Sequence, residues 1–139
     1  MLDNFSINNI FNNPNKKITL FFLVLGSILL IWRNIFLVDF SALLIEPSLI
    51  FFFIKSEVLA LSPYIILFLI ASFIKERWLL IISGLSILLG DIYANYVVYN
   101  SQSSTAGILL IFIPYYLITL MFIIIGLGKL FMYIKTKYS

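Results

Sequence analysis

The segment from Trp78 to Tyr99, WLLIISGLSILLGDIYANYVVY, restricts the fold more than any other part of the chain. It is long enough to cross a bilayer, which takes about 20 consecutive, mostly apolar residues. Its one charged side chain is Asp91. Ionisable groups are rare at such depth because leaving water costs them several kcal/mol, so a carboxylate there needs a partner or a wet cavity. The segment therefore predicts a membrane-spanning helix with a polar site inside it.

The composition shows that this segment is typical of the chain. The 139 residues are 63% hydrophobic and 11% charged, with a mean hydropathy of +1.12. Soluble domains contain about 45–50% apolar and about 25% charged residues. We therefore expect a single transmembrane helical domain over residues 1–139, with room for about four spans and none for a separate soluble domain.

Breaks in the apolar pattern delimit four spans, at about residues 18–38, 58–74, 78–99 and 106–128. The segment before the first span lacks the small-residue cleavage site of a signal peptide, so this span is expected to be an uncleaved anchor. Glu46-Pro47 marks a boundary, because the residue before a proline avoids helical geometry. Residues 39–57 are interrupted by charges and predict a loop and an interfacial helix, although residues 40–57 could instead extend the second span. The expected fold class is an all-α membrane protein, a four-transmembrane-helix bundle with a short interfacial helix between spans one and two.

Basic residues are distributed unevenly between the two sides of such a bundle. If both termini lie on the inner side, that side holds Lys16, Lys17, Lys75, Arg77, Lys129, Lys135 and Lys137. The outer side then holds only Arg33 and Lys55 among the basic residues, with Asp39, Glu46 and Glu57. Because short cytoplasmic loops are rich in Lys and Arg, we predict that the N and C termini are cytoplasmic.

Missing residue types exclude several kinds of chemistry. The sequence has no Cys and no His, which rules out disulfides and thiol catalysis and removes the commonest general base and metal ligand. It has no metal-ligand spacing, no glycine-rich phosphate loop and no pair of carboxylates in one span. We therefore predict a protein that is not an enzyme, with no catalytic residues, no metal and no cofactor. The basic residues lie at helix ends, so they do not indicate a nucleic-acid-binding face.

Polar residues of different spans fall at one depth in the membrane. At 1.5 Å per residue from the inner face, Arg33 lies about 22 Å deep and Asp91 about 20 Å deep, with Tyr115 and Tyr116 at a similar level. In one arrangement Arg33 and Asp91 form an ion pair inside the bundle, and Asn95 with Tyr115 or Tyr116 completes its hydrogen bonds. In the other, Arg33 extends to the headgroups and Asp91 faces a wet vestibule. The predicted intramembrane polar layer therefore consists of Arg33, Asp91, Asn95, Tyr115 and Tyr116, whose ion pair could serve only to fix helix register.

Small residues in the third span predict a surface for close helix packing. Ser86, Gly90 and Ala94 recur every fourth residue, which places them in one stripe. Packing within the chain is one interpretation of the stripe, and a homodimer contact is the other. Candidate matching surfaces are Gly26-Ser27 in the first span and Gly126 and Gly128 in the fourth.

The segment SSTAGILLIFIP, from Ser103 to Pro114, resembles a segment of uncharacterised small four-span bacterial inner-membrane proteins. Those proteins carry Ser-Ser-Thr-Ala shortly before an apolar run with Phe and Pro. The resemblance implies a multi-pass protein of the bacterial cytoplasmic membrane and implies no activity. In size, span number and lack of catalytic residues, the chain also resembles some bacteriocin or toxin immunity proteins.

Two functions remain open at this point. In the first, the chain acts without catalysis by contact with another membrane protein, for example as an immunity protein against a membrane-acting toxin. In the second, it is a small oligomeric transporter or channel that uses Asp91 as a proton or cation site. Multidrug exporters of similar length use one buried carboxylate, but theirs lies in the first span. The expected partners are the lipid bilayer, another membrane protein or toxin, and a second copy of the chain.

Overall fold

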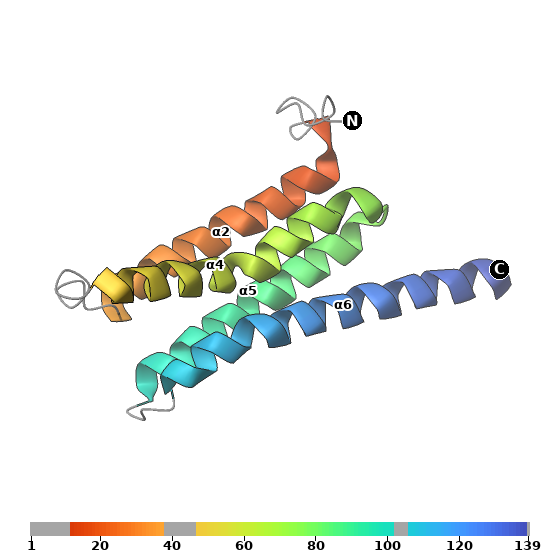
Figure 1. The fold of residues 1–139 in the computed structure, drawn as a ribbon. Coiled ribbons are helices and arrows are strands. Elements are labelled where there is room, and N and C mark those ends of the chain that lie inside the picture. Colours follow the sequence, from red (N-terminus) through yellow and green to blue (C-terminus); the bar gives the residue numbers. More distant parts are fainter. Residues whose placement is uncertain (1–11, 38–46, 102–105, 139) are drawn as a thin grey trace.

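Four long helices make up the fold in the computed structural model, which describes residues 12–37, 47–101 and 106–138 (Figure 1). They are α2 (Pro14–Leu37), α4 (Pro47–Ile70), α5 (Arg77–Asn100) and α6 (Ala106–Tyr138), and a short 3-10 helix, η1 (Ala71–Phe73), follows α4. The described ranges contain no strand. All four helices are long and apolar enough to cross a membrane. The predicted all-α, multi-pass four-helix bundle is therefore confirmed.

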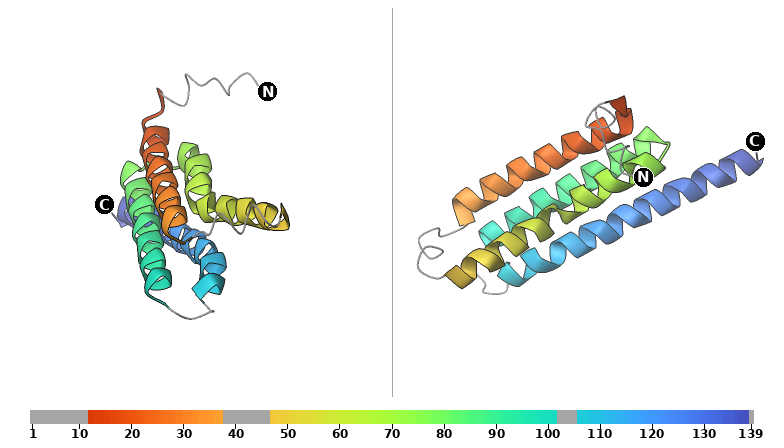
Figure 2. Two further views of the ribbon diagram at one scale, coloured as in Figure 1. Left: turned by 90° about the vertical axis from the view of Figure 1, so that its left-hand side faces the viewer. Right: turned by 45° about the horizontal axis from the view of Figure 1, so that its top comes forward.

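The helices alternate in direction, and α2 and α6 each pack against both α4 and α5. Helices α4 and α5 contact each other less than either contacts α2 or α6, because they lie diagonally across the bundle (Figure 2). They do so even though only a short link joins them. The start of α2, the α4–α5 link and the end of α6 lie at one end of the bundle (Figure 1). We call this the basic end, because it carries Lys16, Lys17, Lys75, Arg77 and Lys129.

Apolar side chains cover the outside of the bundle as well as its interior. The core contains fully buried side chains such as Leu67, Leu80, Ile87 and Met121. Large apolar side chains also point outward, as at Phe51, which is 74% exposed. A helix that is apolar all round suits a bilayer, where the outward face contacts lipid instead of water.

Helix α4 differs from the prediction. It begins at Pro47 and runs through Lys55 and Glu57 to Ile70, so residues 47–57 continue the second span and do not form a separate interfacial helix. Proline suits the first position of a helix, because its missing N–H is not needed there. The short interfacial helix is thus not shown, and residues 39–46 of that prediction lie outside the described residues.

Two prolines lie inside helices, Pro63 in α4 and Pro114 in α6. A proline removes one backbone hydrogen bond and its ring crowds the preceding turn, so helices bend at such positions. Figure 2 shows in its left view that α4 changes direction along its length. Tyr64, which directly follows Pro63, is fully buried.

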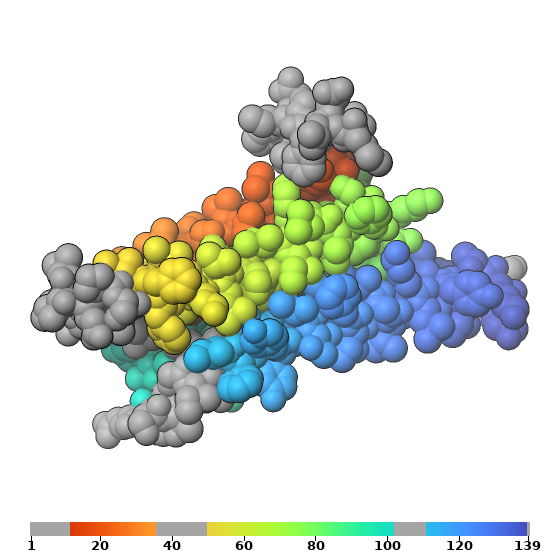
Figure 3. Space-filling view, viewed as in Figure 1, coloured from red at the N-terminus to blue at the C-terminus, as the bar shows by residue number. Residues whose placement is uncertain are grey.

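Helix α6 extends beyond the predicted end of the fourth span at residue 128. Its 33 residues make it about 50 Å long, compared with about 30 Å for the hydrocarbon core of a bilayer. The last turns project past the other helices at the basic end (Figure 3).

Candidate functional site

An ion pair connects α2 to α4 inside the bundle. The Arg33 guanidinium donates from Nη2 to Oε1 of Glu57 over 2.8 Å, and Nδ2 of Asn34 donates to Oε2 of the same carboxylate over 2.9 Å. Both carboxylate oxygens of Glu57 therefore have a donor. The Arg33 and Glu57 side chains are only 9% and 16% exposed, so the pair lies away from the lipid.

The prediction that Arg33 pairs with Asp91 is wrong. Arg33 takes Glu57 as its partner, because α4 starts at Pro47 and carries this carboxylate into the bundle beside α2. The alternative in which Arg33 extends to the headgroups is also wrong, since the residue is 8% exposed.

Asp91 is held by two neutral groups. The hydroxyl of Tyr64 on α4 donates to Oδ2 of Asp91 over 3.1 Å. Nδ2 of Asn95, one turn further along α5, donates to Oδ1 over 3.3 Å and to the backbone carbonyl of Asp91 over 2.8 Å. Asn95 is buried and Asp91 is partly buried, so the structure brings these two predicted residues together inside the bundle.

Tyr64 reaches Asp91 because α2 leaves room for its ring. A Cβ atom added to Gly26 would lie 2.6–2.8 Å from three carbon atoms of the Tyr64 ring. Real Cβ contacts are essentially never that short, so only glycine permits this approach. Gly26, Tyr64 and Asp91 thus connect α2, α4 and α5 at one level of the bundle.

The interior polar groups contain more acid than base. The interior holds two carboxylates, Glu57 and Asp91, but one guanidinium, Arg33, among the described residues, and that guanidinium is paired with Glu57. Asp91 has no cationic group within salt-bridge distance among the described residues. The amide oxygen of Asn95 is buried and has no hydrogen-bond partner there. This arrangement provides oxygen atoms that could hold a proton or a monovalent cation, whereas it offers no nucleophile with a base beside it.

Tyr115 and Tyr116 lie outside this interior group. They are 56% and 73% exposed, because the inward face of α6 is set by Pro114, Leu117 and Met121. Residues three and four apart share one helix face, and the positions directly after Pro114 therefore turn away from the bundle. Tyr115 lines a shallow hollow between α4 and α6.

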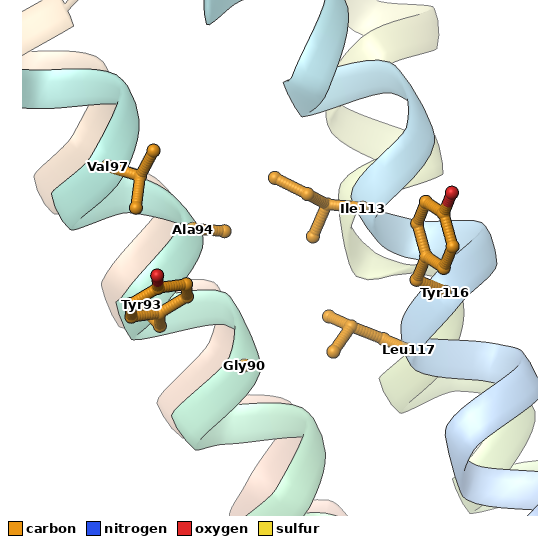
Figure 4. Close-up of a pocket in the computed structure, with 7 residues that line it drawn as sticks. All are labelled: Gly90, Tyr93, Ala94, Val97, Ile113, Tyr116 and Leu117. Atoms are coloured by element: carbon orange, nitrogen blue, oxygen red, sulfur yellow. The ribbon is translucent and has the colours of Figure 1, made fainter. Parts of the chain in front are cut away.

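The predicted small-residue stripe faces α6 within the same chain. A Cβ atom on Gly90 would collide with the Leu117 side chain, and Ala94 is buried, whereas Ser86 is only partly buried. Beyond Gly90 the two helices separate and leave an open groove of about 390 Å³. We call it the α5–α6 groove; its lining residues are Gly90, Tyr93, Ala94, Val97, Ile113, Tyr116 and Leu117 (Figure 4). In Figure 4, Ala94 and Val97 point toward α6 and Ile113 and Leu117 point toward α5.

The glycines predicted to match this stripe differ in what they pack against. Gly26 packs against Tyr64 on α4, and Gly128 packs against Leu79 of α5. A Cβ atom on Gly126 would meet nothing within 4 Å, so the prediction that Gly126 matches a packing surface within the chain is wrong.

The roles of Glu57 and Tyr64 are not predicted from the sequence. With the second span predicted to start at Val58, Glu57 falls on the outer side of the membrane. A signal was present in Pro47, a residue that favours the first turn of a helix and could have marked its start. Tyr64 follows an interior proline at nearly the depth of Asp91, but nothing in the sequence shows that Gly26 makes room for its ring.

The described residues contain no group of three or more acidic, His or Cys side chains that could hold a metal ion. Comparisons with protein-family models, with curated proteins and with solved structures found no match.

Proposed function

We propose that this chain acts without catalysis, by contact with another membrane protein inside the bilayer. One concrete form is immunity to a membrane-acting toxin, which the chain would block by occupying the toxin or its target. We infer a bacterial cytoplasmic membrane from the resemblance of the Ser103–Pro114 segment, and cytoplasmic termini from the distribution of basic residues. The lipid bilayer and a second copy of the chain are further partners of this proposal.

The observation that carries the proposal is the α5–α6 groove. Its α5 wall is low, because Gly90 and Ala94 have little or no side chain, and this leaves a hollow beside Leu117 that a side chain of another helix could fill. Its rim carries the hydroxyl groups of Tyr93 and Tyr116, which are 68% and 73% exposed and can hydrogen-bond to a partner helix. A groove with small residues in one wall and polar groups at its rim favours recognition of a helix.

The test fills the groove from a position that is only partly buried. Val97→Phe places a ring in the groove, and the matched control, Leu89→Phe, adds the same ring on the lipid-facing side of the same helix, where Leu89 is 63% exposed. Cells that produce each variant are challenged with membrane-acting bacteriocins that the native chain resists. We expect Val97→Phe to lose protection at an unchanged yield of folded protein, while Leu89→Phe keeps it. Full protection by Val97→Phe would rule the groove out.

A second candidate function is transport of a proton or monovalent cation through a small oligomer. It is favoured by Asp91, a carboxylate inside the bundle with no cationic group at salt-bridge distance in the part of the chain that the structure describes. In this case Asp91→Asn should abolish ion flux into vesicles while the protein still folds, and Tyr64→Phe should reduce the flux. If Asp91 serves only to hold α5 against α4, both variants lower the folded yield and no flux is seen with the native chain.

A further inference from the structure

The last ten described residues of α6 leave the bundle. Gly128 packs against Leu79, at the first turn of α5, so the bundle ends at this level. Residues 129–138, which we call the α6 extension, continue as helix for about 15 Å beyond it. Figure 3 shows this part of α6 projecting past α4.

A straight α6 extension would carry apolar side chains into water. The headgroup layer on one side of a bilayer is only about 5–8 Å thick, which is less than the length of the extension. Phe131 is 64% exposed, Ile134 is 47% exposed and Tyr138 is 80% exposed. No other helix of the described bundle covers these side chains, so something outside the bundle has to shield them from water.

The α6 extension is amphipathic. At 100° per residue, four of its six large apolar or aromatic side chains fall within one arc of about 100°; they are Leu130, Phe131, Ile134 and Tyr138. Tyr133 lies about 60° outside this arc, and Met132 lies on the opposite side of the helix. Lys129, Lys135 and Lys137 lie outside this arc, and Thr136 lies opposite its centre. A helix with an apolar arc and lysines around the rest is typical of a segment that lies in the plane of a membrane surface.

The charge of the α6 extension indicates which kind of membrane surface it would bind. No acidic residue follows Asp91 in the sequence, so the α6 extension is purely cationic. The same end of the bundle carries Lys17, Lys75 and Arg77. Juxtamembrane lysines of this kind attract anionic lipid headgroups.

Glycines stand where the helix leaves the bundle. An added Cβ at Gly126 would meet nothing within 4 Å, so packing within the chain does not require glycine there. Glycine weakens a helix interior, and helices bend readily at such residues. Gly126 and Gly128 therefore provide a bending point at the end of the bundle.

We propose that α6 bends at Gly126–Gly128 and that the α6 extension lies on the membrane surface at the basic end. Its apolar arc enters the upper acyl region, and Lys129, Lys135 and Lys137 bind anionic lipid headgroups. This surface differs from the α5–α6 groove and does not depend on the function proposed for it.

The absence of cysteine allows a direct test with single spin labels on the full chain. Ile134→Cys puts a label on the apolar arc, and Thr136→Cys puts one on the opposite side as the matched control. The purified protein is reconstituted into vesicles that contain phosphatidylglycerol or only phosphatidylcholine, and the access of oxygen and of a water-soluble nickel complex is measured. In phosphatidylglycerol vesicles we expect the label at 134 to favour oxygen and the label at 136 to favour nickel.

Two further arms test the role of the headgroups and of the bend. The difference between the two labels should shrink in phosphatidylcholine vesicles and on replacing Lys129, Lys135 and Lys137 together by Gln. Gly126→Ala should reduce this difference as well.

Equal nickel access at both positions in phosphatidylglycerol vesicles would overturn the proposal, since the extension then stands in water. Shielding of the label at 134 from both reagents, with spin–spin broadening, would overturn it in favour of a second copy. An unchanged difference in phosphatidylcholine would overturn the binding of anionic headgroups.

Discussion

Tyr64 contacts three helices from one position in the middle of the bundle. Its ring lies against the Gly26 backbone of α2, its own backbone belongs to α4, and its hydroxyl donates to Asp91 of α5. The side chain is 1% exposed, so its packing and its hydrogen bond depend on the same narrow space. A small change at any of the three residues should therefore affect the other two.

We expect Gly26→Ala to destabilise the protein, because the added methyl group displaces the Tyr64 ring and lengthens its bond to Asp91. Overpacking of this kind costs about 1–3 kcal/mol. Gly126→Ala is the matched control, since its methyl group meets no atom within 4 Å and should leave stability unchanged or slightly higher. Equilibrium unfolding in mixed micelles measures both free energies, and equal effects of the two substitutions would contradict this account.

The ion pair between α2 and α4 predicts strong coupling between its members. Glu57→Gln removes the counter-charge of a buried guanidinium and should cost about 3 kcal/mol of unfolding free energy. The double variant Arg33→Gln, Glu57→Gln leaves no unpaired charge and should recover much of that loss. Lys55→Gln, two residues away at an exposed position, should have little effect. Additive losses in the double variant would show that the two side chains do not interact.

Among single residues, the sequence identifies Arg33 and Asp91 as interior polar groups but not the partners that they take. Counting along the helices predicts nearly the same level for both, and the structure brings both inside the bundle. The sequence does not determine which carboxylate pairs with Arg33, because the pairing depends on where α4 begins and on how α2 and α4 are rotated. The exposure of Tyr115 and Tyr116 likewise follows from the rotation of α6, which composition does not determine.

At the element scale, the boundaries of α4 and α6 were the hardest to predict. The charges of Lys55 and Glu57 predict a loop, yet both residues lie within α4, where Glu57 pairs with Arg33 of α2 and Lys55 is exposed. The sequence does not show that Glu57 has a partner, because that partner belongs to another helix. The four long apolar runs themselves were predicted correctly, since their length is set by the thickness of the bilayer.

The continuity of α4 can be tested by hydrogen exchange. If residues 51–57 belong to a helix inside the bilayer, their amides should exchange as slowly as those of residues 64–70. Mass spectrometry of the protein in nanodiscs resolves the two segments. Fast exchange limited to 51–57 would instead support the interfacial helix expected from the sequence, because such a helix borders water.

For the whole molecule, four antiparallel helices bring the start of α2 and the end of α6 to the same side of the membrane. Reporter fusions at the two termini should therefore give the same result, and the basic end predicts that both reporters are cytoplasmic. Moving Lys129, Lys135 and Lys137 to the link after α5 should produce molecules of mixed orientation. Opposite locations of the two reporters would contradict a bundle of four spans.

The ion pair also has a consequence for how the chain enters the membrane. Each charged side chain alone adds about 2.5–3.5 kcal/mol to the insertion of a helix centre. Helices α2 and α4 are consecutive during synthesis, and Arg33 and Glu57 meet between them. The first helical hairpin can thus leave the insertion machinery with these two charges already paired, before α5 has been translated. Helix α5 is inserted later, and the Tyr64 hydroxyl of α4 is then available as a hydrogen-bond donor to Asp91.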